Sequence, residues 1–384
     1  MTSDQHPSGP LHGVRVVELG GIGPGPFAGM MFADLGAEVV RIDRPGNDGP
    51  RLAALERGRR SVVLDLRRPE GVAAALQLTD RADVLIEGFR PGVTERLGLG
   101  PEDCWQRNPK LVYGRMTGWG QEGPWAQTAG HDIAYIAVTG TLHAIGRADG
   151  PPQVPLNVVG DFGGGGMYLV AGVLAALLEA NRSGRGQVVD AAIVDGAASL
   201  MTAMYGMFGS GAWRDERGRN LLDTGTPFYD VYETADGGHM AVGALEPKFY
   251  AEFVSLLGLD PEDADRDDPT GWPALRERIA AAFKSRTRDE WAAVFDGSDA
   301  CVAPVLSMTE APSHPQVAAR GTFAEVDGTT VPVPAPRFSR TQGAVSRPPA
   351  ASGEHTRATL TDWGVSDVDA LIESGVAVDR SGRE

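Results

Sequence analysis

A chain of 384 residues can bury a full-sized hydrophobic core, and this length predicts two to three domain-sized units. Its 42% hydrophobic and 22% charged residues are typical of a soluble globular protein, and its net charge of −16 argues against binding nucleic acid or an anionic membrane. The N-terminal residues lack the pattern of a signal peptide, and two distant cysteines favour neither a disulfide framework nor a zinc site, so we expect a cytoplasmic protein without a metal.

The first 120 residues alternate between β-branched runs and helical patterns. We predict strands over residues 14–19, 37–42, 61–66, 83–88 and 111–118, and helices over residues 26–36, 69–82 and 94–108. Repeated strand–helix–strand units predict an α/β fold with a parallel, doubly wound sheet. Ligands of such sheets bind at the carboxyl ends of the strands.

The middle of the chain is rich in apolar and small residues. Residues 162–178 form the longest uncharged apolar stretch, which is glycine-rich and too short for a membrane span and is therefore expected to be buried. An apolar helix is predicted over residues 167–184. A strand and turn follow over 186–196, and a methionine-rich helix over 198–211 is expected to pack in the core. The pattern changes near residue 225, where we place the start of a smaller domain, 225–322, that is helical over 247–299.

Arginines are concentrated between residues 41 and 68, at positions Arg41, Arg44, Arg51, Arg57, Arg59, Arg60, Arg67 and Arg68. Such a concentration in an acidic chain favours a polyanionic ligand, because the guanidinium group matches phosphate with two parallel hydrogen bonds. A solvated helix with salt bridges would give the same composition, and both interpretations remain open at this point.

The segment "GPGPFA", residues 23–28, imitates the glycine fingerprint of nicotinamide dinucleotide enzymes, and Asp43 follows at about the expected distance. However, Pro24 and Pro26 remove amide donors from the loop that would hold a pyrophosphate. The arginines on both sides of Asp43 also oppose its role toward a ribose hydroxyl. The sequence therefore disfavours a dinucleotide site.

Two further positions carry possible acid–base chemistry. His131 stands with Asp132 between a glycine and an apolar segment, where a histidine is more often a core residue or a helix cap. Asp161 precedes four glycines in "DFGGGG", where an aspartate can simply cap a helix while the glycines allow close packing. The residues alone leave both roles open.

Four long segments carry a family resemblance: "DVLIEGFRPGVTERLGLGP" (83–101), "GRMTGWGQEGPWAQTAGHDIAY" (114–135), "PLNVVGDFGGGGMYL" (155–169) and "GQVVDAAIVDG" (186–196). With them, nearly the whole chain resembles the family III CoA-transferases and, within that family, the α-methylacyl-CoA racemases. The resemblance implies a Rossmann-like large domain built from both chain ends, 1–224 and 323–384, with a smaller α+β domain between them. It also implies an interlocked homodimer.

The resemblance separates two chemistries. Transferases of the family use an aspartate as nucleophile, whereas the racemases keep this aspartate and add a histidine in a Gly-His-Asp setting. Asp161 matches the shared aspartate and His131 the racemase histidine. The resemblance thus implies interconversion of (2R)- and (2S)-2-methylacyl-CoA thioesters in branched-chain fatty acid metabolism, with CoA as part of the substrate and no separate cofactor. The alternatives are a CoA transferase with Asp161 as nucleophile, or a thioester-binding protein without turnover.

The resemblance also assigns supporting residues. Glu246, from the small domain, would orient His131, although a glutamate here could equally cap the helix that starts at Pro247. The CoA moiety would be held by residues that follow the predicted strands and by the backbone after Gly130: Arg44, Leu64, Asp65, Leu66, Arg67, Gly88, Phe89, Arg90, Arg96, Gly130, His131, Asp132, Ile133, Ala134 and Tyr135. On this interpretation CoA is the polyanionic ligand that the arginines would bind.

The chemistry of a thioester agrees with these assignments. Inverting the α-carbon needs removal of a proton on one face and delivery on the other, which His131 and Asp161 can perform as a pair that shares one proton. Ordinary pKa values of about 6.5 for histidine and about 3.9 for aspartate are far apart, so we predict a pocket that raises the pKa of Asp161. We also expect amides of residues 161–166 to stabilise the enolate.

Overall fold

The computed structural model describes residues 9–46, 53–326 and 328–382. This part of the chain forms two compact units. The first takes in the described residues up to Thr139, then Leu156–Leu200, and the described residues from Gly321 onward. The second consists of Gly140–Pro155 and Met201–Arg320. The two units are described one at a time below.

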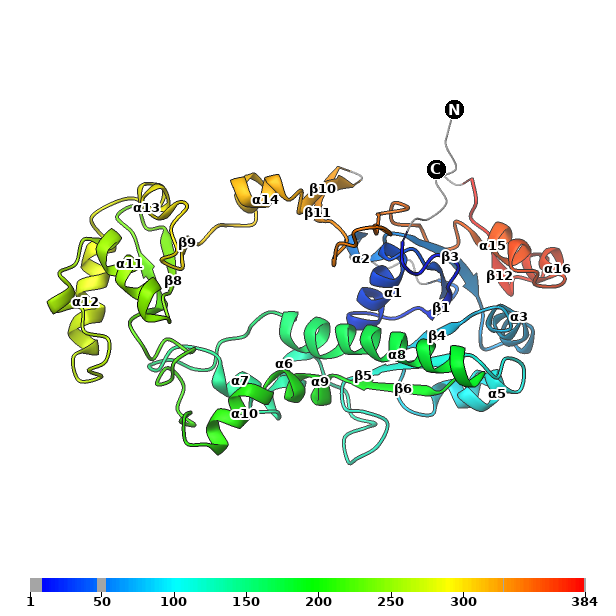
Figure 1. Ribbon diagram of the computed structural model, residues 1–384. Coiled ribbons are helices and arrows are strands. Elements are labelled where there is room, and N and C mark those ends of the chain that lie inside the picture. Colours follow the sequence, from blue (N-terminus) through cyan, green and yellow to red (C-terminus); the bar gives the residue numbers. More distant parts are fainter. Residues whose placement is uncertain (1–8, 47–52, 327, 383–384) are drawn as a thin grey trace. The chain divides into compact units, whose positions relative to one another are not determined.

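The first unit is built on a seven-stranded sheet with the order β12-β3-β2-β1-β4-β5-β6 (Figure 1). Strands β1 to β6 are parallel to their neighbours, and β12 is antiparallel to β3. The β-branched runs of the central strands are buried, as expected where helices cover both faces. The predicted α/β fold with a parallel sheet is confirmed. The strands are β1 (Arg15–Leu19), β2 (Glu38–Asp43), β3 (Arg59–Leu64), β4 (Val84–Glu87), β5 (Val112–Thr117), β6 (Val188–Ala192) and β12 (Ala377–Val378).

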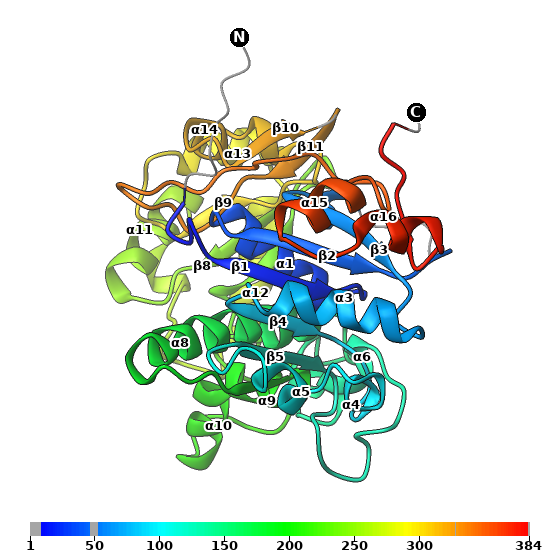
Figure 2. The same cartoon turned by 90° about the vertical axis from the view of Figure 1, so that its right-hand side faces the viewer.

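Helices cover both faces of this sheet (Figure 2). One face packs against α3 (Pro69–Thr79), α5 (Pro101–Trp105), α15 (Thr356–Asp362) and α16 (Val368–Glu373). The other face packs against α1 (Pro24–Asp34) and α8 (Tyr168–Ser183). Trp363, after α15, is almost fully buried and donates from Nε1 to Glu38 at 3.0 Å, which fixes the C-terminal segment to the sheet.

Helix α8 corresponds to the predicted apolar helix. Together with η1 (Val158–Met167), a π-helical segment before it, α8 is long and apolar enough to cross a membrane by length and composition alone. One side of α8, including Leu169 and Val173, packs against the sheet, whereas Leu178 on the other side is exposed. The helix is therefore only partly buried within its own unit.

The remaining elements of the first unit are α2 (Ala53–Glu56), α4 (Val93–Leu97), α6 (Asp132–Ala137), α9 (Ile193–Leu200), β10 (Phe323–Val326) and β11 (Thr329–Pro332). The single helix predicted over 94–108 is wrong: the chain forms α4 and α5, because Gly98 adopts φ +74 and ends the first of them. The sequence pattern also missed β12 and the antiparallel pairing of β10 with β11.

The second unit has a three-stranded antiparallel sheet, β7-β8-β9, covered by helices around an aromatic core that includes Phe253, Phe283 and Trp291. Its elements are α7 (Thr141–Ala144), α10 (Thr202–Gly209), β7 (Tyr229–Glu233), β8 (His239–Gly243), α11 (Pro247–Leu257), η2 (Pro261–Asp263), α12 (Trp272–Phe283), α13 (Arg288–Phe295), β9 (Val302–Pro304), η3 (Ala311–Ser313) and α14 (Pro315–Ala319).

This unit includes chain that the sequence analysis placed in the large domain, namely Gly140–Pro155 and the residues from Met201 to 224. Arginine contacts explain the difference. Arg147 is ion-paired with the buried Asp230 of β7, and Arg217 donates to the carbonyl oxygens of His143 and Gly150, each at 2.7 Å.

Candidate active site

A cleft of about 570 Å³ opens at the carboxyl edge of the sheet in the first unit. Its walls come from residues after β1, from residues 88–91 after β4, from the loop after β5, and from Asn157 and Asp161. This volume lies within the range of pockets that hold small molecules. The position is the one expected for a ligand of a doubly wound sheet.

His131 and Asp161 both line this cleft. His131 follows the long loop after β5 and is the N-cap residue of α6, but its side chain makes no capping hydrogen bond, so the imidazole is free to face the cleft. Asp161 lies in the first turn of η1 and is half-buried. Two segments that are 30 positions apart thus contribute to one site.

Asp132 connects these two segments. Its Oδ2 accepts a hydrogen bond from the backbone N–H of Asp161 at 2.6 Å. Gly160 approaches the same carboxylate so closely that a Cβ there would lie 2.2 Å from Oδ2. Asp132 is buried, and its Oδ1 has no hydrogen-bond partner among the described residues. The neighbour of one predicted acid–base residue therefore fixes the backbone of the other.

The surroundings of Asp161 change its protonation in the expected direction. Burial raises the pKa of Asp161, a hydrogen bond from Asn157 at 3.3 Å opposes this, and the nearby Asp132 adds to the increase. Gly23, at φ +70, leaves the carboxylate accessible, because a Cβ at this position would lie 3.3 Å from Asp161 Oδ2. Asp161 can thus hold a proton at a higher pH than an exposed aspartate.

The glycines after Asp161 serve packing. A Cβ on Gly164 would lie 2.7 Å from the backbone nitrogen of Ala197, so this glycine allows η1 and α9 to touch. The N–H of Asp161 donates to Asp132, and the N–H of Phe162 donates to the Asn157 carbonyl oxygen. The expectation that these two amides face an enolate is wrong, because both already have partners.

The predicted CoA-binding residues fall into two groups. Six line the cleft: Gly88, Phe89, Arg90, Gly130, His131 and Tyr135. The others lie outside its walls: Arg44, Leu64, Asp65, Leu66, Arg67, Arg96, Asp132, Ile133 and Ala134. Leu64 is fully buried in the sheet, and Arg67 is 82% exposed and paired with Asp65 at 2.9 Å.

Much of the arginine cluster is structural. Arg41 pairs with Asp43, Arg57 with Asp34 and Arg59 with Glu18, and all of these side chains are buried. Buried carboxylates therefore explain these three arginines, and the expectation that the cluster as a whole awaits CoA is wrong. Arg51 lies outside the described residues. Asp43 also accepts from Ser61, so its oxygens are engaged.

Glu246 belongs to the second unit, where it is exposed at the N-cap of α11 without a capping hydrogen bond from its side chain. Its role toward His131 stays a prediction. Sequence reasoning missed Asn157, Gly23 and Glu87, although all three line the cleft. The only signal for Glu87 was an acidic residue that ends an otherwise apolar strand.

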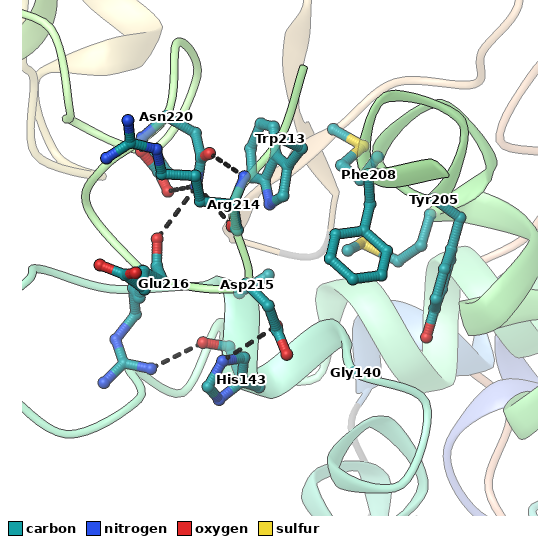
Figure 3. Close-up of a pocket in the computed structure, with 14 residues that line it drawn as sticks. Gly140, His143, Tyr205, Phe208, Trp213, Arg214, Asp215, Glu216 and Asn220 are labelled. Atoms are coloured by element: carbon teal, nitrogen blue, oxygen red, sulfur yellow. Dashed lines mark hydrogen bonds and ion pairs between the residues drawn. The ribbon is translucent and has the colours of Figure 1, made fainter. Parts of the chain in front are cut away.

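The second unit contains a different pocket, of about 270 Å³ (Figure 3). Its apolar lining comes from Met201, Met204, Tyr205, Phe208 and Trp213, next to an ion pair between His143 Nε2 and Asp215 at 3.3 Å. None of the residues of α10 is buried. The predicted core packing of these methionines is therefore wrong within this unit.

Comparison with known proteins agrees with this arrangement. The model of CoA-transferase family III matches residues 11–356. The chain is 48% identical to alpha-methylacyl-CoA racemase of Mus musculus, over 94% of this chain and 95% of that protein, and 44% identical to that of Homo sapiens, over 95% and 98%. A solved CAIB/BAIF family protein from Brucella suis superposes with a TM-score of 0.80 at 26% identity, covering 93% of this chain and all of that one. The chain belongs to CoA-transferase family III.

Proposed function

We propose that this protein is an α-methylacyl-CoA racemase that interconverts (2R)- and (2S)-2-methylacyl-CoA thioesters. The observation that carries the proposal is the presence of His131 and Asp161 in one cleft, in a chain whose similar relatives are named as such racemases. The reaction uses no metal or redox cofactor, because the thioester itself makes the α-proton acidic. We place it in the cytoplasm.

The two residues act as an acid–base pair on opposite faces of the α-carbon. In one direction neutral His131 removes the α-proton, and protonated Asp161 delivers a proton to the other face. In the reverse direction ionised Asp161 removes the proton and the imidazolium of His131 returns one. Each starting form holds one proton between the two groups, so the raised pKa of Asp161 supports both directions.

We also propose an interlocked homodimer, supported by large exposed apolar side chains of the first unit such as Leu156 and Leu178. Light scattering that gives the mass of a single chain would contradict the dimer.

Proton NMR in heavy water tests the reaction. We expect (2S)-2-methylacyl-CoA, without any free acid, to lose its α-proton signal and to yield the (2R) epimer. His131→Ala and Asp161→Ala should each slow epimerisation by about 10²- to 10⁴-fold, because each removes one proton-transfer group. His12→Ala, an exposed histidine outside the cleft, is the matched control.

The same samples distinguish the racemase from the two alternatives. A wild-type protein that shows no exchange, but transfers CoA once a free acid is added, would be a transferase with Asp161 as nucleophile. Neither exchange nor transfer, with CoA still bound, would leave a binding protein without turnover.

A further inference from the structure

Glu87 is a buried carboxylate in the cleft that the proposed mechanism does not use. It is the last residue of β4 and only 3% exposed, and it stands directly before Gly88, Phe89 and Arg90. Its Oε2 accepts a hydrogen bond from the backbone N–H of Phe89 at 2.7 Å. The carboxylate therefore closes the turn formed by residues 88–90, on which three of the predicted CoA contacts lie.

The carboxylate is supported from neighbouring elements. Arg115 lies beside Glu87 in the register of β4 and β5, with its Nε 3.8 Å from Glu87 Oε1. The same guanidinium is shared with Gln121, at 2.6 Å, and with Glu95 of α4. On its other side, Arg115 is paired with Asp190 in the register of β5 and β6. One arginine thus faces three carboxylates and cannot fully neutralise Glu87.

This environment makes Glu87 titratable near neutral pH. Burial raises its pKa to about 7, the hydrogen bond from Phe89 and the charge of Arg115 lower it, and Glu95 and Asp190 raise it. Above neutral pH the ionised carboxylate accepts a charge-assisted hydrogen bond, which is stronger than a neutral one. As the pH falls through about 7, the group gains a proton and this support weakens.

We propose that Glu87 is a positioning residue whose carboxylate holds the 88–90 turn in the shape that binds the CoA moiety. The proposal rests on the proposed function, because it assumes that CoA occupies this cleft. Glu87 moves no proton of the substrate; it acts through the backbone of Phe89. Its effect therefore falls on binding and KM, and not on kcat.

Glu87→Gln tests this role, because the amide keeps the shape and one acceptor oxygen but has no charge. The probe is CoA itself, titrated by calorimetry at about pH 6 and about pH 8. At about pH 8 we expect the variant to bind about tenfold more weakly than the wild type, as expected for losing part of a charge-assisted hydrogen bond. The ratio of its affinities at the two pH values should be smaller than that of the wild type.

Glu102→Gln is the matched control, because Glu102 is an exposed glutamate of α5 that neither lines the cleft nor shifts the pKa of Glu87. Its affinity ratio should equal that of the wild type, which also corrects for titration of the CoA phosphates. Glu87→Asp adds a geometric test: it keeps the charge but shortens the reach to Phe89, and it should also weaken CoA binding. Melting temperatures show whether each variant is folded, and kcat at saturating substrate should stay within about twofold of the wild type.

The proposal is overturned if Glu87→Gln binds CoA with the wild-type affinity ratio, or if kcat falls while CoA affinity does not. Failure of the proposed function is a separate outcome. A wild type that binds CoA but does not epimerise a thioester would contradict the racemase and leave the role of Glu87 in CoA binding intact.

Discussion

The cleft of the first unit and the pocket of the second unit are built in opposite ways. In the cleft, polar side chains are fixed by buried contacts: Asp132 holds the amide of Asp161, and Glu87 holds that of Phe89. In the pocket, α10 buries none of its residues, and the apolar lining combines the flexible side chains of Met201 and Met204 with aromatic rings. The cleft therefore has polar groups in a fixed geometry, whereas the pocket has an apolar surface that can adapt to different shapes.

The cleft and the pocket also differ in the environment of their charged groups. Burial raises the pKa of Glu87 and Asp161, which line the cleft, and the pKa of Asp132, which accepts a hydrogen bond from the Asp161 amide. The charged pair of the pocket, His143 with Asp215, is mostly solvent-exposed. The cleft therefore contains carboxylates whose ionised form is disfavoured by burial, whereas the charged pair of the pocket is solvated.

Outside the proposed acid–base pair, the largest expected effect comes from removing the hydrogen bond between Asp132 and the Asp161 amide. Asp132→Ala removes the acceptor for the Asp161 amide, so we expect kcat for epimerisation to fall about 100-fold, the scale of a small misplacement of a catalytic group. Asp132→Asn keeps an acceptor oxygen and should recover much of this loss. Equal loss in both variants would show that the charge, and not the anchor, matters.

The second prediction concerns pH. Because the folded state raises the pKa of Asp161, it binds more protons than the unfolded state between the two pKa values, and stability falls as the pH rises through this window. Asp161→Asn should therefore melt at a higher temperature than the wild type near neutral pH, with the difference shrinking toward acid. Thermal melts over a pH series measure this.

The pair also predicts a bell-shaped pH–rate profile. On the proposed mechanism the active forms hold one proton between His131 and Asp161, so the rate should fall when both groups are protonated and when both have lost their protons. A flat profile between about pH 5 and about pH 9 would contradict a shared proton.

The parallel sheet could be predicted for physical reasons that lie in the chain itself, whereas the proposed acid–base pair came from the family resemblance. Continuous β-branched runs specify buried parallel strands, and the carboxyl ends of such strands share one edge. His131 lies in the loop after β5, and Asp161 lies in η1 before α8, which packs against β5. Family resemblance was still needed to choose these two residues among other polar positions.

Other features could not be predicted because they depend on contacts between distant segments. A basic cluster is the same in composition whether its arginines bind phosphate or pair internally, and only the buried partners of Arg41, Arg57 and Arg59 decide between these roles. The hydrogen bond from the Asp161 amide to Asp132 forms only because the backbone at Gly160 and Asp161 lies close to the Asp132 carboxylate. The pattern of a methionine-rich helix does not indicate whether other parts of the chain pack against it.

The smallest effect is expected for Arg67, which the sequence alone could not distinguish from Arg90 as a possible phosphate partner. Arg90 lines the cleft, whereas Arg67 is largely exposed and paired with Asp65 outside its walls. An exposed pair contributes little to stability or binding, so Arg67→Ala should change KM for the acyl-CoA by less than about twofold. Arg90→Ala should raise it about fivefold, because a phosphate would lose a charge-assisted partner. The reverse order would place the CoA phosphates over Asp65 and Arg67, beyond the cleft, as the family resemblance implied.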